Sequence, residues 1–428
     1  MHSIGIDFGT TNTVLAYPGA SGTAEVQSFT RQGEKFEAVR TTLSFRRNPV
    51  RGAAPVAEAG PWAIHDFIES PEDTRFLQSF KSFAASRSFT DTAVFTKRYK
   101  FENLLADFIG KVRDHAGLAG FPRQLVVGRP VTFAGQSPDD ELALRRYEAA
   151  FAELGMEHVH YVLEPVAAAH FYAQRLTRDA VILVGDFGGG TSDFSILHFK
   201  VDTNGVKAEA LGHSGLGIAG DTFDYRIIDN VVSPRLGKNA TYRSWGKTLP
   251  VPVHYFASFS RWNELCLMQR PEVIRDLKDL VRNSSEGEQL QSLIDLIEGG
   301  VSYDLYQTVS RVKAQLSHTD IAQFVFNSSG VVIETTIARA DFESWIAEDL
   351  EKIGACVDSA LVKANIGSKD IDRIFLTGGT SYVPAVRKVF EQRFPTDRID
   401  TGEQLLSIAK GLALIGASGE AEKWSVKP

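Results

Sequence analysis

Cysteine is nearly missing from this sequence. Only Cys266 and Cys356 occur in 428 residues, and they lie far apart in the chain. Two isolated cysteines argue against a disulfide framework and against a thiolate metal site. We therefore expect two buried and chemically inert thiols.

Long apolar runs and clusters of positive charge are also missing. Met1-His-Ser leads directly into an apolar strand pattern, with neither a basic leader nor a stretch long enough to cross a membrane. The 46 Lys and Arg residues are dispersed among 53 Asp and Glu residues, for a net charge of −7. These absences predict a cytoplasmic protein that binds neither nucleic acid nor a membrane.

Apolar residues are plentiful enough for more than one core. Hydrophobic residues make up 43% of the chain and charged residues 23%, which is typical of globular proteins. Because 428 residues exceed what one core accommodates, we expect two to three domains.

The most informative stretch is a predicted hairpin near the middle of the chain. Val181–Val184 has the apolar run of a buried strand, and Phe194–Leu197 supplies the returning strand. Gly188–Gly190 remove every Cβ atom at the bend, so backbone N–H groups can approach an anion closely. Asp186 and Asp193 bracket the bend, and two carboxylates at a phosphate-sized space require a hard cation such as Mg²⁺. The hairpin predicts a metal–phosphate site.

A second copy of this pattern stands at the N-terminus. Ile4–Leu15 repeats the order of apolar strand, Asp-Phe-Gly, small hydroxyl residues and second strand. The two Asp-Phe-Gly triplets begin at Asp7 and Asp186, which are 186 − 7 = 179 residues apart. Either turn alone is compatible with a plain Gly/Thr hairpin at a sheet edge. Both together, at a domain-sized spacing, indicate an internal duplication whose halves share one cleft.

Two charged residues between the hairpins are candidates for the same cleft. Lys81 lies between Phe80 and Phe83, within residues 60–118, which are predicted to be predominantly helical. An aliphatic stem with a solvated head is the structural alternative to an ammonium that reaches a phosphate. Glu164 stands between a strand and an alanine-rich helix, where it is either a helix N-terminal acid or a group of the cleft.

Glycines recur in the second half of the chain. Residues 215–220 match G-x-G-x-x-G literally, but they follow an existing phosphate hairpin rather than opening a βαβ unit, which argues against a nicotinamide site. Glycines that open a helix beside the same phosphates fit better. The helix Val309–Ser317 presents Lys313 and Ser317 on one face, and the strand beginning at Ile371 ends in a double-glycine turn suited to a ring or ribose.

These motifs, in this order, resemble the nucleotide-binding domain of the DnaK-type seventy-kilodalton heat-shock proteins, and most of all the YegD-type heat-shock-related proteins. The resemblance implies an α/β, actin-like ATPase fold with two duplicated ribonuclease-H-like lobes around a nucleotide cleft. Lobe I would span residues 1–178 with a small subdomain at about 40–118, and lobe II residues 179–428 with a small subdomain at about 222–310.

The resemblance also implies ATP or ADP with Mg²⁺ as ligands, and it assigns roles to residues that match the family's motifs. The metal would be held by Asp7, Asp186 and Asp193, and the catalytic residues would be Lys81, Glu164 and Asp193. The nucleotide would be bound by Gly9, Thr10, Thr11, Asn12, Gly188, Gly189, Gly190, Thr191, Gly220, Asp221, Lys313, Ser317, Gly378, Gly379, Thr380 and Tyr382.

The sequence departs from the family's pattern at three places. Ser310 replaces a glutamate of the adenosine helix, and Tyr382 replaces an arginine that covers adenine, so base specificity is open. No hydrophobic linker and no β-sandwich pattern follow residue 420, so we expect no built-in site for unfolded peptides.

The leading functional hypothesis is a slow Mg²⁺-dependent ATPase, a heat-shock or chaperone-related module that acts on an unidentified protein partner. The alternatives are an actin-like, nucleotide-gated scaffold or filament, and a small-molecule kinase of the same superfamily. No acceptor motif for a kinase is recognisable, and no sequence feature decides for or against a filament.

Overall fold

The structure is a computed structural model that describes residues 3–50, 52–70, 73–133, 137–156, 158–173, 178–202, 205–260, 268, 270–299, 301–400 and 406–425. The chain forms two compact units. Unit 1 comprises Met1–Gly217, Ile353–Ser381 and Phe390–Pro428, and unit 2 comprises Ile218–Lys352 and Tyr382–Val389. This division does not test the lobe boundary near residue 178, which stays a prediction.

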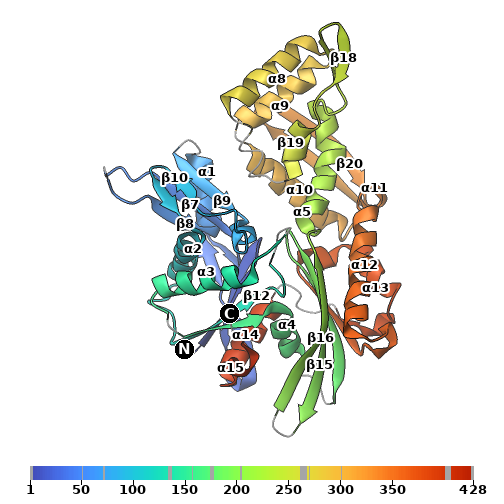
Figure 1. Cartoon of the computed structure of the whole chain (residues 1–428). Helices are drawn as coiled ribbons and strands as arrows, with labels where there is room; N and C mark the ends of the chain where they lie inside the picture. Colours follow the sequence, from blue (N-terminus) through green and yellow to red (C-terminus); the bar gives the residue numbers. More distant parts are fainter. Residues whose placement is uncertain are drawn as a thin grey trace. The chain divides into compact units, whose positions relative to one another are not determined.

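The first sheet of unit 1 is built around the N-terminal strand (Figure 1). Its strand order is β3-β2-β1-β12-β13, and β6 also pairs with β2. The three strands on one side are antiparallel, whereas β1, β12 and β13 are parallel. The strands are β1 (Ser3–Phe8), β2 (Asn12–Pro18), β3 (Ala24–Val26), β6 (Ala38–Arg40), β12 (Gln124–Arg129) and β13 (Val159–Leu163).

The second sheet of unit 1 has the same plan. Its order is β16-β15-β14-β21-β22, again with three antiparallel strands followed by parallel pairing from β14 onward. The predicted duplication is therefore confirmed at the level of strand order and direction. The strands are β14 (Ala180–Phe187), β15 (Ser192–Asp202), β16 (Gly205–Leu216), β21 (Arg373–Thr377) and β22 (Ile399–Asp400).

The two predicted hairpins occupy equivalent positions in these sheets. In the first, the Gly9 N–H donates to the Asn12 carbonyl at 3.0 Å, and in the second the Gly188 N–H donates to the Thr191 carbonyl at 2.9 Å. Both pairs are three residues apart and follow an Asp-Phe pair, so the sequence repeat produces the same turn twice.

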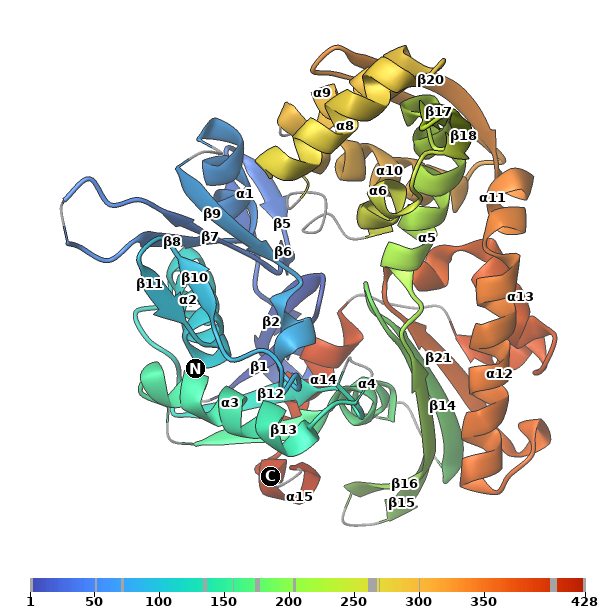
Figure 2. The same ribbon diagram turned by 45° about the horizontal axis from the view of Figure 1, so that its top comes forward.

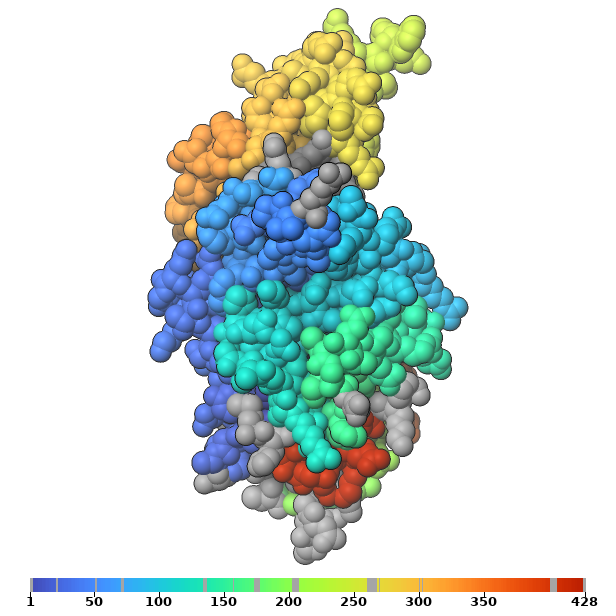
Figure 3. Space-filling view, turned by 90° about the vertical axis from the view of Figure 1, so that its left-hand side faces the viewer, coloured from blue at the N-terminus to red at the C-terminus, as the bar shows by residue number. Residues whose placement is uncertain are grey.

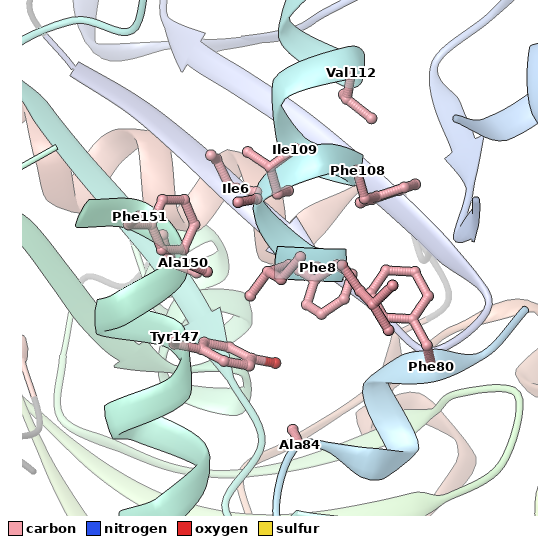
Figure 4. Packing of buried hydrophobic residues seen from close by; sticks show 14 of the residues in the cluster. Ile6, Phe8, Phe80, Ala84, Phe108, Ile109, Val112, Tyr147, Ala150 and Phe151 are labelled. Carbon is pink, nitrogen blue, oxygen red and sulfur yellow. The ribbon is translucent and has the colours of Figure 1, made fainter. Parts of the chain in front are cut away.

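Helices cover both faces of the first sheet. Strand alternation sends Ile4, Ile6 and Phe8 to the face that carries α2 (Phe101–His115) and α3 (Asp140–Glu153), where they join a large buried cluster (Figures 2 and 4). Gly5 points to the other face, where a Cβ atom would lie 2.5 Å from the backbone of α14 (Ser407–Ala417). The absence of a side chain at Gly5 lets α14 lie directly on the sheet.

Helix α4 (Glu164–Ala173) packs against α14 at very short range. A Cβ atom on Gly411 would lie 1.8 Å from the carbonyl oxygen of Ala167. Residues of both helices share one buried cluster with Ala180, Ile182 and Val184 of the second sheet. The crossing of α4 and α14 therefore joins the two sheets of unit 1.

The last described segment lies on the first sheet. Helix α15 (Ala421–Trp424) places Trp424 edge-on to His170, and Ser425 forms an antiparallel bridge with Val162 of the edge strand β13. In the space-filling view, red residues of the C-terminal part of the chain lie beside blue-green residues of its first half (Figure 3).

The prediction that residues 60–118 are predominantly helical is wrong, because strands interrupt the helices there. Among the described residues there, the α-helices are α1 (Gly60–Glu69) and α2, joined by the short 3-10 helix η2 (Phe80–Phe83), and the strands between them are five residues long or shorter, too short for periodicity to distinguish them. The peripheral elements of unit 1 are η1 (Ala20–Gly22), β4 (Phe29–Arg31), β5 (Glu34–Phe36), β7 (Thr42–Arg46), β8 (Val56–Ala59), α1 (Gly60–Glu69), β9 (Thr74–Gln78), η2 (Phe80–Phe83), β10 (Thr92–Val94), β11 (Lys97–Tyr99), η6 (Ser368–Asp370), η7 (Gly379–Tyr382) and η8 (Thr396–Arg398).

Unit 2 is mainly helical, with two small antiparallel hairpins, β17–β18 and β19–β20. Helices α12 (Ala347–Ala364) and α13 (Pro384–Glu391) contain residues of both units. The remaining elements are α5 (Gly220–Ile227), η3 (Ile228–Val232), η4 (Ser233–Leu236), β17 (Thr241–Ser244), β18 (Lys247–Pro250), α6 (His254–Ala257), η5 (Ser258–Ser260), α8 (Pro271–Asn283), α9 (Gly287–Glu298), α10 (Ser302–Leu316), β19 (Ile321–Ser328), β20 (Val331–Ala338) and α11 (Arg339–Trp345).

The described residues bear on two expectations from composition, which concern membrane-spanning segments and the two cysteines. Among the described helices, none is both long and apolar enough to cross a membrane. Cys356 is a free, buried thiol, as expected, whereas Cys266 lies outside the described residues.

The helix crossing makes a direct prediction for stability. Gly411→Ala places a methyl group against the Ala167 carbonyl, so we expect the free energy of unfolding to fall by about 1–3 kcal/mol, although alanine is the better helix former. Urea unfolding followed by circular dichroism measures the change. Gly120→Ala is the control, because no atom lies within 4 Å of its new Cβ. Equal stability of the two variants would show that the crossing tolerates a side chain.

Candidate functional site

The second hairpin brings two carboxylates face to face. Asp186 on β14 pairs directly with Asp193 on β15, and Asp193 in turn lies opposite Gly215 on β16. A Cβ atom on Gly215 would lie 2.4 Å from Oδ1 of Asp193. Glycine at this position therefore leaves the space that the Asp193 carboxylate occupies. This explains one glycine of the G-x-G-x-x-G match without a dinucleotide.

The first hairpin presents Asp7 and a braced turn. Buried Thr41 holds this turn: its hydroxyl donates to the Gly9 carbonyl at 2.7 Å, and its N–H donates to the Thr11 carbonyl at 2.8 Å. The Thr11 hydroxyl is buried and has no hydrogen-bond partner among the described residues. A buried unpaired hydroxyl on a glycine-containing turn suits an oxygen-rich ligand such as phosphate. Sequence reasoning missed Thr41, because nothing local marks a residue 32 positions away as a brace.

Lys81 and Glu164 form a buried ion pair. Their Nζ and Oε1 atoms are 2.8 Å apart, and their side chains are only 7% and 8% exposed. Lys81 projects from the short helix η2, which follows Ser79 in the left-handed conformation (φ 51°), and its ammonium lies 5.8 Å from the centre of the Phe8 ring. Burial argues against the solvated head that was the alternative for Lys81, whereas Glu164 is indeed an acid in the first turn of α4. The catalytic roles of both residues stay predictions.

Negative charge exceeds positive charge at this site. Burial, together with the Glu164 carboxylate, raises the pKa of Asp7 to about 7 and the pKa of Asp193 to about 7. Burial and the same carboxylates raise the pKa of Asp186 well above its ordinary value. Although burial favours the neutral amine, attraction to Glu164 raises the pKa of Lys81. Among the described residues, Lys81 is the one cation that acts on the pKa of all three aspartates.

This donor set fits a hydrated Mg²⁺ ion. Mg²⁺ prefers carboxylate oxygens and keeps several of its own waters. Among the described residues, no three His, Cys, Asp or Glu side chains lie close enough together to hold a metal directly. The carboxylates of Asp7 and Asp193 nevertheless contribute, after burial and Glu164, to the raised pKa of Asp186. A hydrated ion can contact carboxylates through its own waters, and the assignment of Asp7, Asp186 and Asp193 to it stays a prediction.

The double-glycine turn abuts the second hairpin. Gly378 has φ 86°, and a Cβ atom there would lie 2.0 Å from the carbonyl oxygen of Phe187. The Ser381 hydroxyl closes the turn by donating to the Gly378 carbonyl at 2.6 Å, and Thr380 is buried. The structure thus brings Gly378, Gly379 and Thr380 next to the predicted phosphate turn.

Unit 2 brings together other predicted residues. The Lys313 ammonium on α10 donates to the Gly220 carbonyl at 3.0 Å and lies 2.8 Å from an oxygen of Asp224. Asp221 follows Gly220 in the first turn of α5, and the Ser317 hydroxyl donates to the Lys313 carbonyl at 3.2 Å. Tyr382 is 43% exposed. The Asp224 partner of Lys313 was not predicted from sequence. The nucleotide-binding roles of these residues stay predictions.

A buried arginine at the end of β12 was also missed. The Arg129 guanidinium donates to the carbonyls of Pro130 and Val131 at 3.0 and 3.2 Å, and it lies 3.6 Å from Asp140. Glu164 is among the charges that act on the pKa of Arg129. An arginine at a strand end gives no sequence signal that separates a buried guanidinium from an exposed one.

Comparison with known proteins gives one consistent picture. A family model described as Hsp70 protein matches residues 141–240 and 289–424. The chain is 26% identical over 430 residues to the chaperone protein DnaK of Thermotoga petrophila, covering 98% of this chain and 60% of DnaK. It is 24% identical over 421 residues to the chloroplastic stromal 70 kDa heat shock-related protein of Pisum sativum, covering 92% of this chain and 50% of that protein. The chain thus spans half to three fifths of the length of these relatives. The narrower resemblance to YegD-type proteins stays a prediction.

The raised pKa values predict how the aspartates affect stability. Because the pKa of Asp7 rises from 3.8 to about 7 on folding, its ionisation destabilises the folded state, and stability falls as pH rises between these values. Asp7→Asn should therefore raise the free energy of unfolding at pH 8 in metal-free buffer, by up to about 4 kcal/mol. The gain should vanish towards pH 4.

Asp139→Asn serves as a control in which the expected change in stability has the opposite sign. Asp139 caps α3, and hydrogen bonds from Leu142 and Arg87 lower its pKa, so its replacement should reduce stability at pH 8. Thermal unfolding from pH 4 to 8 measures both variants. A lower free energy of unfolding for Asp7→Asn than for the wild type at pH 8 would contradict the raised pKa of Asp7 and the excess of carboxylates at the site.

Proposed function

Because the chain belongs to the Hsp70 family, we propose that it binds ATP and ADP with Mg²⁺ and hydrolyses ATP slowly. The family has the actin-like ATPase fold, and the two sheets of equal strand order are the duplicated core of that fold. One observation carries the proposal: two equivalent hairpins carry three buried aspartates, and among the described residues Lys81 is the only buried ammonium.

The phosphates of ATP would lie along the two turns. Backbone N–H groups within the turns, those of Thr10, Thr11, Gly189 and Gly190, would donate to phosphate oxygens, with the unpaired Thr11 hydroxyl as a further donor. Asp7, Asp186 and Asp193 would hold Mg²⁺, which supplies positive charge to the phosphate oxygens when bound. Gly378–Thr380, and in unit 2 Gly220, Asp221, Lys313, Ser317 and Tyr382, are the proposed nucleoside-side residues.

Hydrolysis requires charge neutralisation and an oriented water, not covalent catalysis. The Lys81 ammonium would stabilise charge that develops on the terminal phosphate. Glu164 and Asp193 would accept hydrogen bonds from the attacking water. The Thr191 hydroxyl, which hydrogen-bonds to Asp193, and Gly215, which leaves room for it, fix the direction of that carboxylate.

We further propose a chaperone-related role with a protein partner. This step rests on the names of the relatives, a chaperone and a heat shock-related protein, of which the chain spans only part. Nothing in the described residues identifies the partner.

Lys81 provides the test of hydrolysis. Lys81→Met should lower the rate of phosphate release from ATP by about 10²-fold or more, because it removes a preorganised charge, while ATP affinity changes less. Single-turnover phosphate release and calorimetric binding measure the two effects. Lys97→Met, at an exposed position, is the control and should match the wild type.

Loss of Lys81 alone leaves Glu164 buried without its partner, which can destabilise the fold by about 3–5 kcal/mol. The double variant Lys81→Met/Glu164→Gln removes both charges and controls for this effect. Wild-type rates in Lys81→Met would contradict the mechanism, and ATP binding without any release in the wild type would leave a nucleotide-gated switch instead of an ATPase.

A further inference from the structure

Tyr147, on α3, lies beside the proposed catalytic pair but belongs to none of the motifs that identified the site. Its side chain is fully buried, and its hydroxyl has no hydrogen-bond partner among the described residues. A buried hydroxyl usually finds a partner, because an unpaired one costs about 1–3 kcal/mol. An unpaired donor at this place therefore calls for an explanation.

The aromatic residues around Tyr147 fix its direction. Its ring packs edge-on to Phe8 at 5.9 Å, stacks on Phe101 at 6.0 Å and lies edge-on to Phe133 at 5.6 Å. Figure 4 shows the hydroxyl pointing into the space bordered by Phe8, Phe80 and Ala84. With three rings against it, the side chain has no room to turn away from this space.

The same space adjoins the Lys81–Glu164 pair. Lys81 follows Phe80 directly, and its ammonium lies over the same Phe8 ring that Tyr147 contacts. The charges of Lys81 and Glu164 are the leading influences, after burial, on the pKa of Tyr147, which is raised so that the hydroxyl keeps its proton. Tyr147 is thus a neutral donor next to a buried carboxylate.

Ligand binding would change the partners of Glu164. In the structure, its Oε1 atom accepts a hydrogen bond from Lys81 at 2.8 Å. If Lys81 moves to a terminal phosphate, as the proposed function requires, Glu164 loses this partner while it stays buried. An ionised carboxylate in that position needs another donor to remain charged and oriented.

We propose that the Tyr147 hydroxyl is a positioning residue that donates a hydrogen bond to Glu164 when Lys81 engages the terminal phosphate of ATP. This inference rests on the proposed function. The hydroxyl holds Glu164 in the orientation that binds the attacking water, and Tyr147 itself does not touch the reacting atoms. The unpaired hydroxyl is thereby explained as a donor that is used in only one state of the site.

The experiment compares Tyr147→Phe with a matched variant, Tyr161→Phe. Tyr161 is also buried, with an unpaired hydroxyl in the same cluster, but the charges that act on its pKa are Glu148 and Tyr147, not Lys81 or Glu164. Steady-state phosphate release at varied MgATP yields kcat and KM for each protein. We expect kcat to fall about 10-fold or more in Tyr147→Phe, as for loss of a hydrogen bond to a charged group, with KM within about 3-fold of the wild type.

The outcomes separate this inference from the proposed function. Tyr161→Phe should keep wild-type kcat and KM, whereas a purely structural effect of removing a buried hydroxyl would act on both variants alike. If wild type and Tyr161→Phe are active and Tyr147→Phe equals them, the role of Tyr147 is wrong and the ATPase stands. If the wild type releases no phosphate, the proposed hydrolysis fails, and the role of Tyr147 fails with it.

Discussion

The attraction between one buried ammonium and several carboxylates is the interaction on which this site depends. Lys81 is paired with Glu164, and the remaining carboxylates of Asp7, Asp186 and Asp193 are left without a full countercharge. A protein core does not tolerate such an excess without a reason, because each buried charge needs a partner. In the proposed function a hydrated divalent cation would balance this excess, and the glycine turns beside it would supply N–H donors for the phosphates that accompany that cation.

The rest of unit 1 serves to bring these charges together. Asp7 and Asp186 stand near the ends of the central strands β1 and β14, and the two sheets are joined where α4 crosses α14. Three contacts depend on the absence of a side chain: Gly411 against Ala167, Gly378 against Phe187, and Gly215 against Asp193. On the other face of the first sheet, the aromatic cluster around Phe8 supports both Lys81 and Tyr147. In this region, the contacts that form the core therefore also position the residues of the site.

The features of unit 1 that depend on patterns within short segments were predicted from the sequence. The two hairpins and the strand before Glu164 follow from glycine placement and apolar runs. The equal strand order of the two sheets could be anticipated because the repeat at Asp7 and Asp186 places the same turn at the same point of each half.

Contacts between segments that are distant in the sequence could not be predicted from local patterns. The strands within residues 60–118 are too short for a period, and β9 is a strand because it pairs with β7. Tyr147 looks like any core residue of an amphipathic helix, and only the packing of three rings shows where its hydroxyl points. Thr41 and Arg129 are similar cases, because their roles lie in hydrogen bonds to turns that their own neighbours do not predict.

The most direct test of the account is calorimetric titration of the protein with ATP, with Mg²⁺ present and with Mg²⁺ removed by chelation. Because three aspartates repel an unaccompanied triphosphate, we predict binding that is at least about 10-fold tighter with Mg²⁺. Asp186→Asn, which removes one of the repelling charges, should reduce this dependence. Equal affinity with and without Mg²⁺, or no binding in either condition, would contradict the assignment of these carboxylates to a metal–nucleotide site.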